Sequence, residues 1–179
     1  MAREGKNPEK TKQAVGRLIE LILKSGIETS EDEFIQNEVL KTLIWKYTEA
    51  QERVGGAGVN AKYLSCPIWS AAAFESFKVH GKRYLELEHV TTRAELKERI
   101  KKSGSPEVLS HAVTCVVTES EHKFLEDKTK EDWERYERSG IKLTRMARPD
   151  REAMLKFVKG QSKDWPQPEF KGYPYEGVR

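Results

Sequence analysis

Three short segments constrain where helices begin in this chain of 179 residues. In each, a Ser or Thr is followed three residues later by Glu, so that the two side chains can satisfy free backbone N–H groups at a helix start. The segments are Ser30–Glu33, Thr92–Glu95 and Thr118–Glu121. The last follows residues 112–117, whose β-branched side chains favour a buried strand. The sequence therefore predicts a strand that leads directly into a capped helix.

Apolar residues at helical spacing predict two N-terminal helices, over residues 11–24 and 30–53. We expect these helices to pack on each other, with dimerisation or DNA docking as alternative roles. Residues 63–67 precede or include a proline and are expected to form an extended segment or a turn. The remaining pattern predicts a strand over 83–90 and helices over 68–77, 92–102, 118–126, 132–139 and 148–159.

This order of elements predicts an α+β fold that is mainly helical, with a small two-stranded β element at its centre. The length fits one domain over residues 1–179. Within it we expect an N-terminal helical pair over 1–54, a core over 61–140 and an irregular, proline-containing tail over 160–179.

Composition excludes several classes of protein. The longest apolar runs, residues 18–23 and 112–117, are too short to span a bilayer. The first ten residues are polar and lack the apolar centre of a secretory signal, so we expect a cytoplasmic protein. Two separate cysteines, Cys66 and Cys115, exclude a four-cysteine zinc site and are expected to be buried thiols.

Charge is distributed unevenly around a net charge of +3. Residues 1–26 contain six Lys or Arg and three Glu, whereas residues 27–60 contain three Lys or Arg and seven acidic residues. Basic segments of this size permit contacts with phosphate groups but do not require them.

Two ionisable groups of residues lie where elements end. Glu88 and His89 close the strand over 83–90, and Glu119, Glu121 and His122 lie in the first turn of the helix after the second strand. Histidine is suited to proton transfer near neutral pH, and a neighbouring carboxylate can orient its ring or bind a cation. His89 is therefore a candidate general base, and a helical His122 shares a face with nearby carboxylates.

The segments Leu87–Thr92, Val113–Val117 and Thr118–His122 together resemble the HNH, or ββα-metal, nucleases. The resemblance covers about residues 84–127. It implies that His89 activates water, and that Glu88 and His122 bind magnesium or manganese, with zinc or nickel as alternatives. It also implies hydrolysis of DNA phosphodiester bonds.

The sequence departs from that family at several points. No Asn lies within residues 105–117, Thr91 and Thr92 stand where a proline is common, and no Cys-x-x-Cys pair is present. A basic helix face beside His89 is expected to contact DNA, with a solvated surface as the alternative; its residues are Arg93, Lys97, Lys101 and Lys102. The alternative function is a non-catalytic nucleic-acid-binding or protein-interaction module, with a homodimer as a further expectation.

Overall fold

The computed structural model describes residues 7–51, 54, 61–126 and 133–170. The chain divides into two compact units, each described here by itself. Unit 1 comprises residues 1–52 and 91–113, and unit 2 comprises residues 53–90 and 114–179. The sequence suggested one continuous core over 61–140, but in the structure residues 91–113 belong to the same unit as the N-terminal helices.

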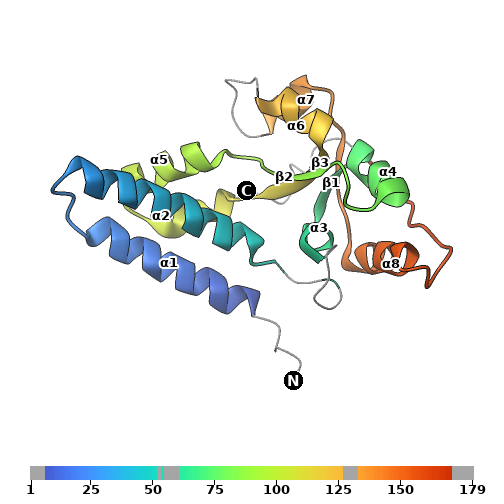
Figure 1. The fold of residues 1–179 in the computed structure, drawn as a ribbon, viewed down its shortest axis with the longest axis horizontal. Coiled ribbons are helices and arrows are strands. Elements are labelled where there is room, and N and C mark those ends of the chain that lie inside the picture. Colours follow the sequence, from blue (N-terminus) through green and yellow to red (C-terminus); the bar gives the residue numbers. More distant parts are fainter. Residues whose placement is uncertain (1–6, 52–53, 55–60, 127–132, 171–179) are drawn as a thin grey trace. The chain divides into compact units, whose positions relative to one another are not determined.

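Unit 1 is helical (Figure 1). Its elements are α1 (Pro8–Lys24), α2 (Ser30–Glu49), α5 (Arg93–Ser103) and the 3-10 helix η1 (Pro106–His111). Thr92 caps α5 as predicted, because its side chain accepts a hydrogen bond from the backbone N–H of Glu95, while the Glu95 carboxylate pairs with Arg99 instead of completing the cap. The cap of α2 lies one residue earlier than predicted. The side chain of Thr29 accepts a hydrogen bond from the N–H of Asp32, and the Asp32 carboxylate accepts one from the N–H of Thr29.

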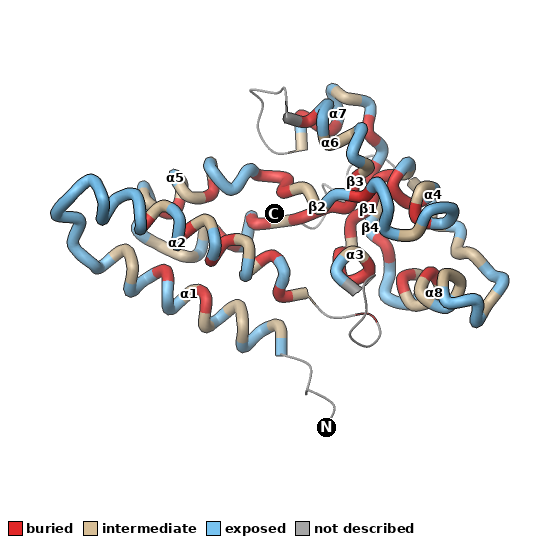
Figure 2. The backbone as a smooth tube through the Cα atoms, viewed as in Figure 1, coloured by how far each residue is buried: buried red, intermediate tan, exposed pale blue. Residues whose placement is uncertain are grey.

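The core of unit 1 lies where α1 and α2 pack on each other and on α5 and η1 (Figure 2). The predicted packing of the two N-terminal helices is therefore confirmed. The buried side chains all come from one face of each helix, as amphipathic spacing requires. They are Val15, Ile19, Leu40, Leu43, Ile44, Leu96, Ile100, Leu109 and Ala112.

Unit 2 is built on a four-stranded mixed sheet with the order β2-β3-β1-β4. Strand β1 is parallel to β3 and antiparallel to β4, and β2 is antiparallel to β3. The strands are β1 (Ile68–Ser70), β2 (Leu85–His89), β3 (Thr114–Thr118) and β4 (Leu143–Arg145). The helices are α3 (Ala61–Ser65), α4 (Ala71–His80), α6 (Glu119–Glu126), α7 (Glu134–Arg138) and α8 (Arg148–Val158).

The predicted α+β class is confirmed, but the sheet has four strands among the described residues where two were expected. The helix expected over 68–77 begins only at Ala71, because Ser70 is its N-cap and accepts a hydrogen bond from the N–H of Ala73. Residues 61–65 form the short helix α3, where an extended segment or a turn was expected over 63–67. Strand β4 was not predicted.

The core of unit 2 joins α4 to the sheet. Trp69, Phe74 and Cys66 are buried in it. Cys115 is buried as well, against Tyr136, so both cysteines are internal as expected. Part of the irregular tail covers this core, because the rings of Trp165 and Phe170 lie 4.8 and 5.5 Å from the ring of Phe74. Residues 171–179 lie outside the described part of the chain. None of the described helices is long and apolar enough to cross a membrane.

Candidate active site

The candidate site lies in unit 2, where β2, β3 and α6 meet. The antiparallel register pairs Glu88 with Cys115 and His89 with Thr114. Leu85 and Leu87, on alternate positions of β2, pack in the core with residues of α4. Strand alternation therefore directs Glu88 to the other face of the sheet, where α6 packs on β2 and β3.

The start of α6 is fixed by the predicted pair of Thr118 and Glu121, each of which accepts a hydrogen bond from the backbone N–H of the other. One carboxylate oxygen of Glu121, Oε2, accepts a hydrogen bond of 2.8 Å from the N–H of Thr118. The same atom accepts a hydrogen bond of 2.6 Å from the hydroxyl of Ser70. Glu121 therefore holds the helix start against β1, and its carboxylate is committed to this structural role.

This geometry brings two of the predicted site residues together. Oε2 of Glu88 and Nδ1 of His122 lie 2.7 Å apart, with 12% and 31% of the two side chains exposed. When the imidazole is protonated, the pair is a half-buried ion pair. The sequence placed both residues at element ends, and the packing of α6 on β2 makes them neighbours.

The sequence did not identify Arg135 of α7, which is the third member of the cluster. Its Nη2 lies 2.5 Å from Oε1 of Glu88 and also donates to the backbone carbonyl of His89. Only 4% of the Arg135 side chain is exposed. A guanidinium that binds one carboxylate oxygen fixes the orientation of the other oxygen toward His122.

The wall beneath this cluster is uncharged. The thiol of Cys115 donates to the hydroxyl of Tyr136 over 3.0 Å. Burial raises the pKa of both groups well above their usual values. The guanidinium carbon of Arg135 also lies over the ring of Tyr136, 5.4 Å from the centre of that ring. The cluster charge thus comes from Glu88, Arg135 and, when protonated, His122.

His89 joins the cluster through its backbone. It is the last residue of β2, and only 6% of its surface is exposed. In a regular strand its ring would lie on the face of Leu85 and Leu87, opposite to Glu88. The structure therefore brings Glu88 and His122 together, whereas the ring of His89 is largely shielded from solvent.

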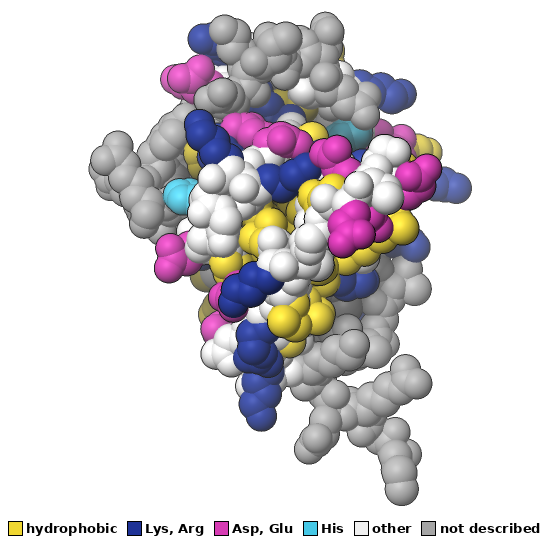
Figure 3. Space-filling model, turned by 90° about the vertical axis from the view of Figure 1, so that its left-hand side faces the viewer, with side chains coloured by type: hydrophobic (Ala, Val, Ile, Leu, Met, Phe, Trp, Pro, Cys, Tyr) yellow, Lys and Arg dark blue, Asp and Glu magenta, His cyan; other side chains and the backbone are white. Residues whose placement is uncertain are grey.

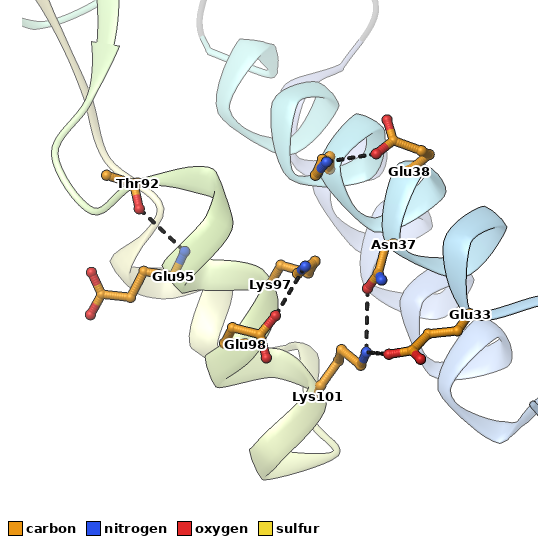
Figure 4. A network of polar contacts seen from close by, with 9 residues as sticks. Glu33, Asn37, Glu38, Thr92, Glu95, Lys97, Glu98 and Lys101 are labelled. Carbon is orange, nitrogen blue, oxygen red and sulfur yellow. Dashed lines mark hydrogen bonds and ion pairs between the residues drawn. The ribbon is translucent and has the colours of Figure 1, made fainter. Parts of the chain in front are cut away.

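The predicted DNA-binding residues belong to α5 in unit 1, whereas Glu88, His89 and His122 belong to unit 2. Lys101 lies 3.0 Å from Glu33 and 3.3 Å from Asn37, both on α2 (Figure 4). Lys97 lies 3.0 Å from Glu98, and the guanidinium of Arg93 lies over the ring of Trp45. Lys102 is exposed. Three of the four residues thus have partners within unit 1.

Carboxylate oxygens and imidazole nitrogens are common metal ligands, but here the two atoms contact each other directly, so a cation would have to replace that contact. A carboxylate oxygen and an imidazole nitrogen already face each other, and hydrolytic sites leave other positions open for water and substrate. Among the described residues, no group of three or more His, Cys, Asp or Glu side chains is arranged to hold a metal ion. Within the described part of the chain, the candidate ligands are therefore Glu88 and His122.

Comparisons of the chain with protein-family models, curated proteins and solved structures gave no match.

Proposed function

We propose that this protein is a divalent-metal-dependent endonuclease that hydrolyses DNA phosphodiester bonds. The observation that carries the proposal is the contact of 2.7 Å between Glu88 and His122. The two residues come from β2 and α6, which with β3 would correspond to the two strands and the helix of a divergent ββα-metal motif.

In this mechanism Glu88 and His122 would hold the ion, and Arg135 keeps the Glu88 carboxylate in place. A bound magnesium or manganese ion would supply Lewis-acid stabilisation of charge on the phosphate and the leaving oxygen. His89 takes the proton from the attacking water. Only 6% of the His89 surface is exposed, and regular strand alternation places its ring on the face opposite to Glu88. This step therefore requires the end of β2 to open and the ring of His89 to turn toward the Glu88 face.

The decisive test is cleavage of supercoiled plasmid DNA with magnesium, manganese, zinc or nickel, and with chelator. We expect the wild type to cut only with metal, and His89→Ala to lower the rate by about 10²–10⁴-fold, the usual contribution of a general base. His80→Ala is the matched control, because His80 is an exposed histidine at the end of α4 in the same unit. Absence of cutting with every metal, or equal cutting by His89→Ala, would contradict the proposal.

The alternative is a non-catalytic binding module, and Arg135 favours it. A cation next to Glu88 must coexist with a guanidinium that already neutralises part of this carboxylate. Thermal unfolding with and without manganese separates the two functions, because an ion bound only by the folded state raises the melting temperature. The nuclease proposal predicts a rise that His122→Ala removes, while the alternative predicts no rise in either protein.

A further inference from the structure

An apolar stripe on the α1–α2 hairpin of unit 1 is left uncovered. Leu18, Leu21, Ile35 and Val39 are 47%, 64%, 59% and 38% exposed. On α1, residues 14, 18 and 21 are separated by four and then three residues, and residues 35, 39 and 42 of α2 have the same separations. Each set therefore forms one stripe along its helix. We call these six residues the hairpin face; they are Ala14, Leu18, Leu21, Ile35, Val39 and Thr42.

Both stripes point away from the other elements of unit 1. On α1, Gly16 faces η1, because a Cβ atom added to Gly16 would lie 3.9 Å from the Cβ of Pro106. On α2, Glu33 and Asn37 mark the side of α5, where they contact Lys101. Two residues along a helix correspond to a turn of about 160°. Leu18 and Ile35, each two residues from these markers, therefore lie on the opposite side of the hairpin.

Charged side chains line the outer edges of the two stripes with opposite signs. Arg17 precedes Leu18 on α1, and Lys10 and Lys24 lie seven residues to either side of it; Glu38 precedes Val39 on α2, and Glu31 lies seven residues before it. These five charged residues are exposed. Within α2, Glu38 also contacts Lys41 over 2.6 Å. Figure 3, which looks at the end where the hairpin turns, shows hydrophobic side chains exposed among basic and acidic ones.

This pattern is self-complementary. If two hairpin faces meet about a two-fold axis parallel to the helices, α1 of each copy lies antiparallel to α2 of the other. The basic edge of α1 then meets the acidic edge of α2 at the same level along the axis. Rotation about the perpendicular axis in the interface would instead place α1 on α1, with like charges facing. The charges thus select one arrangement.

We propose that the hairpin face binds a second copy of this chain, and that the two hairpins form an antiparallel four-helix bundle. The stripe positions follow the alternating three- and four-residue spacing of helices that pack in such bundles. The charged edges then act as the interhelical ion pairs that set partner and orientation. This inference is independent of the proposed nuclease activity.

The first test measures the mass of the full-length protein by light scattering or sedimentation over a wide concentration range. We expect twice the chain mass of 20.6 kDa at high concentration. Leu18→Glu should raise the dissociation constant at least about thirtyfold, as expected for a charge placed at the centre of an interface. The control is Phe34→Glu, because Phe34 is 67% exposed but lies about 100° round α2 from Ile35.

A charge exchange tests the arrangement and avoids loss of folding, because both positions are exposed. Arg17→Glu and Glu38→Arg should each weaken self-association through like charges at the edge. A mixture of the two variants should form a heterodimer, because the two introduced side chains then face each other with opposite charges and the natural pair remains on the other side. A monomer at all concentrations, equal loss in Phe34→Glu, or no heterodimer in the mixture would overturn the proposal.

Discussion

Both units have exposed ion pairs, but unit 2 also has a nearly buried one. In unit 1 the ion pairs lie at the surface, as in Lys41 with Glu38, whose side chains are 41% and 51% exposed. In unit 2 the pair of Arg135 and Glu88 is 4% and 12% exposed. Burying two charges costs hydration energy that a surface pair does not lose. The buried cluster is therefore expected to dominate the response of the protein to substitution.

The difference also separates the roles of the units. Unit 1 has an apolar core of ordinary amphipathic helices and an exposed apolar stripe, which suits association with a second copy. Unit 2 has a polar cluster enclosed between strands and helices. A cluster of this kind is costly to keep unless it orients groups for binding or catalysis.

The largest effect on stability is expected for Arg135→Met. It leaves the Glu88 carboxylate largely buried without its guanidinium partner, which costs about 3–5 kcal/mol for a broken buried pair. Denaturant unfolding measures the free energy. Arg138→Met is the matched control on α7, because its contact with Glu134 is 3.6 Å long and both side chains are more than half exposed. The control should change stability by less than about 0.5 kcal/mol.

A double variant sharpens this prediction. Glu88→Gln removes the negative charge that Arg135→Met would leave unpaired, so the double variant should be more stable than Arg135→Met alone. If Arg135→Met unfolds no more easily than Arg138→Met, the buried cluster does not contribute to stability and the comparison between the units fails.

Sequence periodicity predicted unit 1 better than unit 2. The helices α1 and α2 follow from apolar residues repeated at helical spacing over ten residues or more, and α5 follows from its cap at Thr92 with Leu96 and Ile100 as apolar positions. Strands β1 and β4 have only three residues each, which is too short for a periodic signal. Residues 68–70 also continue into the apolar pattern of α4, so strand and helix merged into one predicted element.

Part of the site followed from the sequence as well. Glu88 and His122 stood out in the sequence because one lies at the end of a strand and the other in the first turn of a helix. In the structure these two side chains are in contact. Arg135 did not stand out, because Arg135 and Arg138 lie on the same short charged helix and only tertiary packing buries one of them. The partners of Lys101 on α2 likewise depend on how α5 packs, which no local pattern encodes.

Alkaline pH should affect unit 2 through its thiols. Burial raises the pKa of Cys66 to about 11, whereas an exposed thiol titrates near about 8.5. The unfolded chain therefore loses this proton first, so stability is full below about pH 8.5 and falls by about 3 kcal/mol as the pH rises to about 11. Unfolding measured across this range should show a shallower fall for Cys66→Ala. Equal slopes in the two proteins would contradict the assignment.

The smallest effect is expected at the surface of unit 1. Lys101→Met removes the contacts of α5 with Glu33 and Asn37 on α2, but Glu33 is 55% exposed and regains water. The loss should be about 0.2–1 kcal/mol and should shrink at high salt, because exposed pairs are screened. Unfolding at low and high salt measures both quantities. A loss as large as that of Arg135→Met would show that solvent exposure does not decide the value of an ion pair in this protein.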